Sequence, residues 1–318
     1  MRRLLAILLA AMIILPIHAS ATSSKLWDDA RLGMNAGTIG GPSILLSNNT
    51  TNEKSTIEVS DLPSVVEVYT ATWCFNCVET ELALDEAIGS HEVLRFHYHR
   101  YLYETLDPFG SESSDSRWIE EYGRGSLESS ETPYLSGTER AAPSKVFDGE
   151  RMYTGDSTRS NSLVTDYSTA LSLGSSHPFQ DNGTLSMEIS KSENGAVVNW
   201  YNDLSSSKDW TAEAVLMIVE DNIYYPNGTN GLDNYHHVLH ETIKLPNWDN
   251  GSLQIVLPHP WDGDDISLIL LIDWETTVPA QAGSLPAPAV STLLCLLAAL
   301  TPRSKKSAVT DDVNHELG

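Results

Sequence analysis

Apolar and polar positions follow a strand, helix, strand order in residues 64–99. Residues 64–70 (SVVEVYT) are rich in β-branched and aromatic side chains, which favours a strand. Residues 78–88 (VETELALDEAI) have helical spacing and stop at Gly89, and residues 93–99 (VLRFHYH) indicate a second strand. A helix between two such strands predicts a βαβ unit, whose strands are parallel.

Two further patterns follow the second predicted strand. Residues 111–132 are rich in Ser and Glu around a small apolar island, which predicts a polar, partly helical excursion. Residues 144–147 and 151–154 flank the dipeptide Asp148-Gly149. Because both residues of this dipeptide tolerate a positive φ, it is typical of the tight turn of a β-hairpin.

From about Asn182 onward, apolar residues alternate with polar ones and no helical period is present. Asn-Gly and Asp-Gly turns separate several of the alternating segments. Short strands joined by turns predict a β-sandwich of about one hundred residues. The segments are Leu185 to Ile189, Val197 to Trp200, Ala214 to Val219, Leu253 to Leu257 and Ile266 to Trp274.

The first 21 residues have the order of a secretory signal peptide. Two arginines precede twelve uninterrupted apolar residues, and the small residues Ala19-Ser20-Ala21 follow Pro16. An uncleaved anchor is the alternative, although the apolar run is shorter than the ~20 residues that span a bilayer. The signal peptide predicts an extracytoplasmic, secreted protein.

The C-terminal region has an apolar stretch followed at once by cations. We predict a transmembrane anchor over residues 283–302 and a cytoplasmic tail over residues 303–318, where Arg303, Lys305 and Lys306 follow the apolar stretch. This anchor would hold the protein to the cell membrane. A buried hairpin or short core helix, and a sorting signal cut by a transpeptidase, are the alternatives.

Composition agrees with an extracytoplasmic globular protein. The chain has 318 residues, enough for two domains, and a net charge of -24. Such an acidic chain lacks the clustered cations that bind phosphates, which excludes nucleic acid as a partner. Five N-glycosylation sequons predict a glycoprotein, at Asn48, Asn49, Asn182, Asn227 and Asn250.

Cys74 and Cys77 lie between the first predicted strand and its helix. A thiol at a helix N-terminus faces unpaired N–H groups, which stabilise its thiolate, and a second thiol three residues on can resolve a mixed disulfide. The alternatives are a permanent structural disulfide, a redox-dead remnant, and a zinc site that borrows His97 or His99. Cys295 lies in the apolar tail segment and is most simply a small hydrophobe.

With residues 72–77 (TWCFNC) after an apolar strand, the chain resembles the thioredoxin-like superfamily. The resemblance implies a cis proline facing the cysteines, and Pro143 in residues 141–149 (AAPSKVFDG) has the matching position. The chain is most similar to secreted bacterial thioredoxin-like proteins of unassigned function, over about ninety residues from Ser64 to Gly155.

The chain also departs from ordinary thioredoxins. Phe75 and Asn76 stand where thioredoxins carry Gly-Pro, and Val68 stands where they carry a buried Asp. Glu67 is one position away, so its side chain should point to the opposite face of the strand. Glu79 and Glu81, expected in the first turns of the helix, should oppose the thiolate.

Two segments of the second half carry potential metal ligands. Residues 235–240 (YHHVLH) are similar to a segment of two-domain, envelope-associated thioredoxin-like proteins whose second half is an immunoglobulin-like sandwich. We expect packing or turn contacts for its histidines, with a metal site as the alternative, because adjacent strand residues point to opposite faces. Residues 262–265 (DGDD) could coordinate calcium but are more typical of a turn.

The predicted fold class is an α/β thioredoxin-like domain followed by an all-β immunoglobulin-like sandwich. The predicted segments are a signal peptide (1–21), an irregular leader (22–60), the thioredoxin-like domain (61–176), the β-sandwich (177–279), the anchor and the tail.

The expected function is thiol-disulfide oxidoreduction on envelope or secreted proteins through a redox-active disulfide. Cys74 would attack, Cys77 resolve, and Pro143 shape the substrate groove. The partners would be protein thiols or disulfides and, through the C-terminal segment, the membrane. No cofactor and no metal is expected. The alternative is a non-catalytic envelope protein that binds a partner or serves as structure.

Overall fold

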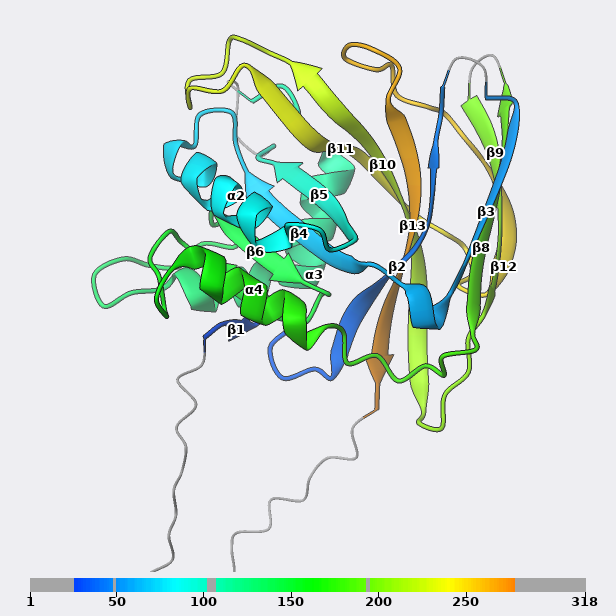
Figure 1. Cartoon of the computed structure of the whole chain (residues 1–318), viewed down its shortest axis with the longest axis horizontal. Helices are drawn as coiled ribbons and strands as arrows, with labels where there is room; N and C mark the ends of the chain where they lie inside the picture. The colour runs from blue at the N-terminus through cyan, green and yellow to red at the C-terminus, as the bar shows by residue number, and fades with distance from the viewer. Residues whose placement is uncertain (1–25, 48–49, 102–106, 193–194, 278–318) are drawn as a thin grey trace, which may run out of the picture. The chain divides into compact units, whose positions relative to one another are not determined.

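The computed structural model describes residues 26–47, 50–101, 107–192 and 195–277 (Figure 1). Within these ranges the elements in chain order are β1 (Asp28–Asp29), β2 (Ala36–Leu45), β3 (Asn52–Glu58), the 3₁₀ turn η1 (Val59–Asp61), β4 (Ser64–Thr70), α2 (Phe75–Ile88), β5 (Val93–His99), α3 (Glu112–Ser130), β6 (Ser144–Phe147), β7 (Arg151–Thr154), α4 (Leu163–Leu173), β8 (Thr184–Ser192), β9 (Gly195–Asp203), β10 (Trp210–Tyr224), β11 (Asn234–Lys244), β12 (Asn250–Ile255) and β13 (Ile266–Thr276).

One mixed sheet connects the helical half of the chain to the β-rich half. Its nine strands have the order β1-β7-β6-β4-β5-β11-β10-β13-β2, and a second, antiparallel sheet has the order β12-β9-β8-β3 (Figure 1). The two halves meet where β5 and β11 pair in parallel, with Val238 opposite His97. The edge strand that a separate α/β domain would expose is therefore covered by β11.

The predicted fold class is wrong. A thioredoxin-like domain followed by an independent immunoglobulin-like sandwich would have two separate sheets, whereas here β5 and β11 belong to one large sheet. Strand is the main regular structure of the described chain, and helices α2, α3 and α4 are the exceptions. The alternation of apolar residues identified strands but not their neighbours, since period 2 reports which face is buried and not which edge is paired.

The prediction of an irregular leader over residues 22–60 is also wrong. Residues 36–45 form β2, the edge strand of the large sheet, and residues 52–58 form β3, the edge strand of the small sheet. Gly40, Gly41 and Pro42 interrupt the pattern of β2 in the sequence. The strand pairs with β13 around a register shift, and a Cβ on Gly41 would lie 2.8 Å from the carbonyl oxygen of Leu270. Close approach to a neighbouring strand therefore explains a glycine that weakened the strand signal.

Other local elements are confirmed. The strands over residues 64–70 and 93–99 are β4 and β5, and they pair in parallel as predicted. β6 and β7 form the predicted hairpin, with positive φ angles at Asp148 (51°) and Gly149 (66°). The polar segment after β5 is helix α3, whose Ser111 makes a capping box with Ser114.

Both faces of the large sheet are buried. On β10, alternate residues pack into two cores: Leu216 and Ile218 face the small sheet, while Met217 and Val219 face helix α3. Near α2 and α4, Val66 and Val68 of β4 pack with Leu84 and Tyr167. The opposite face of β4 contributes to the core that contains Trp118 and Tyr122 of α3.

A buried ionic cluster lies at the junction of these elements. Asp273 of β13 accepts hydrogen bonds from Arg117 of α3 (2.5 Å) and from Arg31, which follows β1 (2.7 Å). Arg117 also lies 3.5 Å from Glu67 of β4, and Tyr122 donates to the same carboxylate (2.5 Å). As predicted, Glu67 therefore points away from the cysteine side of β4. The cluster links segments more than two hundred positions apart.

Membrane segments receive no support from the described part of the chain. None of its helices combines the length and apolar character needed to cross a bilayer. The predicted anchor (283–302), the tail (303–318) and the signal peptide (1–21) lie outside the described residues. The predicted transmembrane helix therefore has no counterpart among the described residues.

Candidate functional site

The two cysteines form a disulfide at the N-terminus of α2. Cys74 is the N-cap residue and Cys77 lies in the first turn, because the helix begins at Phe75 and not at Val78 as predicted. Cys74 is 6% exposed and Cys77 is fully buried, whereas Phe75 between them is 68% exposed. The earlier start also leaves the first turn without an acidic residue. Glu79 and Glu81, which were expected to oppose the thiolate from the first turns, therefore lie beyond the first turn of the helix.

Pro143 has the predicted cis peptide bond, which joins it to Ala142. It directly precedes β6, which pairs with β4, the strand that leads to the cysteines. Ala142 packs in the same small cluster as Cys74, Cys77 and Trp73. The structure therefore brings the segment around Pro143 to the disulfide.

Thr72, two residues before Cys74, joins the disulfide loop to the β10–β11 hairpin. Its carbonyl oxygen accepts hydrogen bonds from the amides of Thr229 (2.9 Å) and Asn230 (3.1 Å), and the Tyr235 hydroxyl lies 3.4 Å from it. The Tyr235 hydroxyl also lies 2.8 Å from the side-chain oxygen of Asn230. A hairpin from the β-rich half is therefore bound directly to the segment that presents the cysteines.

On the other side of Thr72, its amide donates to the buried carboxylate of Asp107 (2.8 Å). Asp107 also lies 3.0 Å from Nδ1 of His99 and accepts from the amide of Phe109 (3.2 Å). The rings of Phe109 and Tyr235 are in contact, with centroids 5.4 Å apart. The loop before Cys74 is thus fixed from both β5 and the hairpin.

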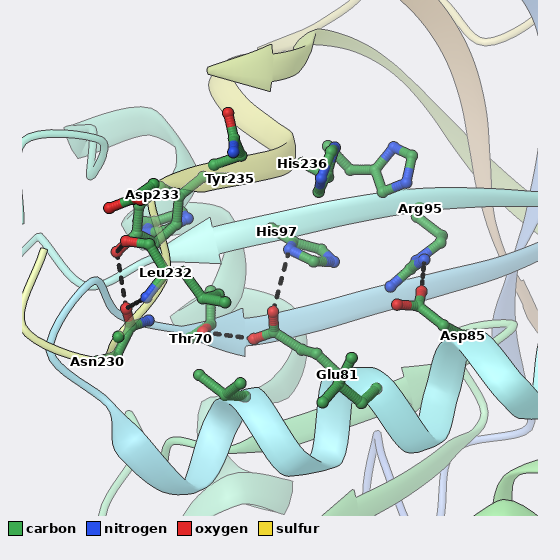
Figure 2. Close-up of a pocket in the computed structure, with 16 residues that line it drawn as sticks. Thr70, Glu81, Asp85, Arg95, His97, Asn230, Leu232, Asp233, Tyr235 and His236 are labelled. Carbon is green, nitrogen blue, oxygen red and sulfur yellow. Dashed lines mark hydrogen bonds and ion pairs between the residues drawn. The ribbon is translucent and has the colours of Figure 1, made fainter. Parts of the chain in front are cut away.

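A cavity of about 600 Å³ opens between α2, the ends of β4 and β5, and the hairpin (Figure 2). Figure 2 shows Glu81 of α2 between Thr70, which donates to it at 2.7 Å, and His97, whose Nδ1 lies 3.9 Å away. Burial, with the charge of Arg95 as the next cause, holds the pKa of His97 well below its ordinary value, so the imidazole is neutral at pH 7. Val78, the residue after Cys77, also lines the cavity.

Lys145 of β6 lies beneath α2 and is fully buried. Its ammonium hydrogen-bonds to the hydroxyl of Thr80, which donates to the carbonyl oxygen of Cys77 (2.8 Å). Burial lowers the pKa of Lys145 to about 8, and the carboxylate of Glu81 partly opposes that shift. A cation therefore lies one helical turn beyond the buried cysteine.

The histidines of the YHHVLH segment do not gather into one site. His237 pairs with Asp221 (2.7 Å), and His240 pairs with the buried carboxylate of Glu220 (2.7 Å). Glu220 also accepts from the amide of Trp261 (2.8 Å). In the described part of the chain, no group of three or more His, Cys, Asp or Glu residues is arranged to hold a metal ion.

Two aspartates of the DGDD segment accept hydrogen bonds from backbone amides. Asp262 accepts from the amide of Tyr224 (2.7 Å) and Asp265 from that of Asn222 (2.9 Å). These contacts are the turn contacts expected for the segment.

Of the sequon residues, Asn182, Asn227 and Asn250 are exposed, while Asn48 and Asn49 lie outside the described residues.

Several site residues were missed by the sequence analysis. Thr72, Lys145 and Tyr235 occur in quoted motifs but received no role, and Asp107 and Asn230 received none either. The hydrogen bond between Tyr235 and Thr72 joins positions 163 residues apart. No local pattern reports a contact of that separation. The signal that was available is a lysine within a short strand that has no other charged residue, residues 144–147 (SKVF).

Comparisons with known proteins identify no family. No family model matches the chain, and no curated protein matches it. Among solved structures, the protein AGR_C_4864 from Agrobacterium tumefaciens is similar at 17% identity and a TM-score of 0.38, covering 61% of this chain and 78% of its own. HBP35 of Porphyromonas gingivalis is similar at 15% identity and a TM-score of 0.37, covering 66% of this chain and 63% of its own.

The predicted membership of the thioredoxin-like superfamily is wrong as a description of this chain. The described chain is built around a nine-stranded mixed sheet that continues from β5 into β11 of the β-rich half. Likenesses this distant carry no functional argument and give no support to a redox-active disulfide.

Proposed function

We propose that this protein exchanges thiols and disulfides with other proteins outside the cytoplasm through Cys74 and Cys77. The observation that carries the proposal is the position of the pair: both sulfurs lie at the N-terminus of α2, and Cys74 is the N-cap residue. Unpaired backbone N–H groups and the positive end of the helix dipole at this position favour a thiolate. The pair therefore has a physical reason to react.

The roles of the two sulfurs follow from their burial. Cys74 retains some exposure and Cys77 has none, so an incoming sulfur reaches Cys74 first. In the reduced protein, the Cys74 thiolate attacks a substrate disulfide and forms a mixed disulfide, and one substrate sulfur leaves as a thiolate. Cys77 then attacks Cys74, which restores the internal disulfide and releases the second substrate sulfur. The substrate is reduced by two electrons and the cysteine pair is oxidised.

The expected partners are proteins with accessible thiols or disulfides. Phe75 gives the site an exposed aromatic surface between the two cysteines, suited to an apolar segment of a partner. The signal-peptide pattern of the sequence supports a location outside the cytoplasm, where protein disulfides form and persist.

The test is reduction of a model protein disulfide by residues 22–277 in the presence of a dithiol. We expect turnover by the wild-type chain, at least a tenfold loss in Cys74→Ser, and a trapped mixed disulfide in Cys77→Ser. The matched control is Ser64→Ala, at the far end of β4. Equal inertness of the wild type and Cys74→Ser across redox buffers would contradict the proposal.

A second candidate is a binding protein without thiol chemistry. His97 and His99, which line the 600 Å³ cavity, each have a buried Nε2 atom with no hydrogen-bond partner among the described residues. Groups of this kind favour a bound ligand that donates a hydrogen bond. A soluble ligand that protects the cavity from hydrogen exchange, in a protein whose cysteines are inert, would favour this candidate.

A further inference from the structure

Lys145 is in an unusual environment for a cation. On β6 it lies opposite Val68 of β4 and Tyr153 of β7, both of which are buried in the apolar core beneath α2 and α4. Its ammonium hydrogen-bonds to Thr80, and no carboxylate forms an ion pair with it within the described residues. An ammonium buried in this way is unfavourable, because a single neutral hydroxyl replaces its hydration.

The groups that face Lys145 leave its charge only partly compensated. Glu81 of α2 favours the charged form, and Arg95 of β5 disfavours it. His97 of β5 is neutral, and the hydroxyl of Tyr153 is directed to Asp166 instead (3.0 Å). Glu67, the buried carboxylate of β4, lies on the opposite face of the sheet with Arg117. A new negative charge near Thr80 would therefore be stabilised by the ammonium of Lys145.

Cys77 is the group that can supply that charge. Thr80 connects the two residues, since its hydroxyl receives the Lys145 hydrogen bond and is 2.8 Å from the carbonyl oxygen of Cys77. Cys77 is fully buried, so water cannot solvate its thiolate and burial by itself disfavours ionisation. Cys74 has the helix N-terminus and partial exposure in its favour, whereas Cys77 needs a nearby cation.

We infer that the ammonium of Lys145 is the charge partner of Cys77 when the disulfide is open and stabilises the thiolate that Cys77 forms on losing its proton. The inference rests on the proposed function. In the resolving step, the Cys77 thiol releases its proton to solvent, and the ammonium of Lys145 stabilises the thiolate that remains. The Cys77 sulfur then forms a bond to Cys74, the bond between Cys74 and the substrate sulfur breaks, and the electron pair leaves with the substrate sulfur as a thiolate.

The test is an NMR titration of the reduced protein with ¹³Cβ-labelled cysteine and ¹³Cε-labelled lysine. In Lys145→Met we expect the pKa of Cys77 to rise by at least one unit, a tenfold loss of thiolate at a given pH. The control variant Lys208→Met removes an exposed lysine from the turn before β10 and should leave Cys77 unchanged. An unchanged pKa of Cys77 in Lys145→Met would overturn the inference.

A measurement on the wild type makes the test independent of how Lys145→Met folds. Reduction of the disulfide should raise the pKa of Lys145, because a thiolate replaces a neutral disulfide. In reduced Cys77→Ser the pKa of Lys145 should stay at the value of the oxidised wild type. Equal lysine titrations in the oxidised and reduced protein would also overturn the inference. Failure of the wild type to reduce any protein disulfide, with the coupled titration intact, would instead reject the proposed function and leave the Lys145–Cys77 pair in place.

Discussion

The amide of Thr229 donates a 2.9 Å hydrogen bond to the carbonyl oxygen of Thr72, two residues before Cys74. Thr229 belongs to the loop between β10 and β11, and Thr72 to the loop between β4 and α2. The conformation of the cysteine loop is therefore coupled to a hairpin of the β-rich half. This contact makes the surroundings of the disulfide a property of the whole sheet rather than of one βαβ unit.

Removing the Tyr235 hydroxyl should loosen this attachment. The hydroxyl lies 2.8 Å from Asn230 and 3.4 Å from Thr72, and burial raises its pKa to about 12. We expect Tyr235→Phe to lower the free energy of unfolding by about 1 kcal/mol and to increase the rate at which dithiothreitol reduces the Cys74–Cys77 disulfide. Tyr201→Phe is the control, since Tyr201 is 60% exposed on the small sheet. Identical reduction rates for Tyr235→Phe and the wild type would show that the attachment does not protect the disulfide.

Asp273 should be critical to the junction between the sheets. Its loss would leave Arg31 and Arg117 buried without their shared partner. We expect Asp273→Asn to lower the free energy of unfolding by about 3–5 kcal/mol, measured by denaturant titration at pH 7. Glu275→Gln, an exposed acidic residue of the same strand, serves as the control. A loss below about 1 kcal/mol would mean that the two arginines are solvated after all.

The same residue predicts the direction of acid denaturation. Burial opposes the charge of Asp273, but Arg117 and Arg31 outweigh it and hold the pKa of the carboxyl below its ordinary value. Because the folded pKa lies below the unfolded one, the contribution is present above about pH 4 and is lost as pH falls below it. Denaturant titrations between pH 2 and pH 5 should show this loss in the wild type, and Asp273→Asn should show a smaller one.

Asp148 should have the opposite dependence on pH. Burial raises its pKa to about 6, although the amide of Val65 donates to its carboxylate (2.8 Å). The folded state therefore binds the proton more tightly, and stability falls as pH rises from about 4 to about 6. We expect Asp148→Asn to raise the free energy of unfolding by about 2–3 kcal/mol at pH 7 and by much less at pH 4.

Asparagine is a suitable replacement at this position. It tolerates the positive φ of 51°, and its side-chain oxygen can still accept from Val65. Asp156→Asn, an exposed site just after β7, is the control and should have no effect at either pH. A destabilisation by Asp148→Asn at pH 7 would show that the carboxylate charge itself is needed in the turn.

Lys145 gives a prediction for the oxidised protein that is separate from its proposed role with Cys77. With a folded pKa of about 8 against 10.5, the folded state binds fewer protons between these values, so stability rises as pH increases from about 8 to about 10.5. Lys145→Met should raise the free energy of unfolding by about 3 kcal/mol at pH 7 and should not show that rise. Thermal unfolding across this range, with Lys208→Met as control, checks both effects. A less stable Lys145→Met protein at pH 7 would mean that the buried ammonium is well paired.

Elements with strong local chemistry were predictable. The hairpin turn at Asp148-Gly149 needs two positive φ angles, and that dipeptide adopts them readily. The strands β4 and β5 were found because β-branched and aromatic residues fill them. The start of α2 was placed three residues late, since Phe75 and Asn76 are poor helix formers that the cysteine loop nevertheless fixes at its N-terminus.

What the sequence determined by itself was five of the six strands described after residue 182, with β11 missed, the βαβ unit and the position of Cys74 and Cys77 at a helix end. Each of these depends on neighbours within a few residues, where periodicity and turn chemistry act. The tertiary structure alone decided that β5 pairs with β11, that residues 36–45 form an edge of the large sheet, and that Lys145 hydrogen-bonds to Thr80, one helical turn after Cys77. Such pairings bring together segments distant in the chain. They are selected by the free energy gained when shared faces and edges are buried, and this free energy cannot be read from a short window of sequence.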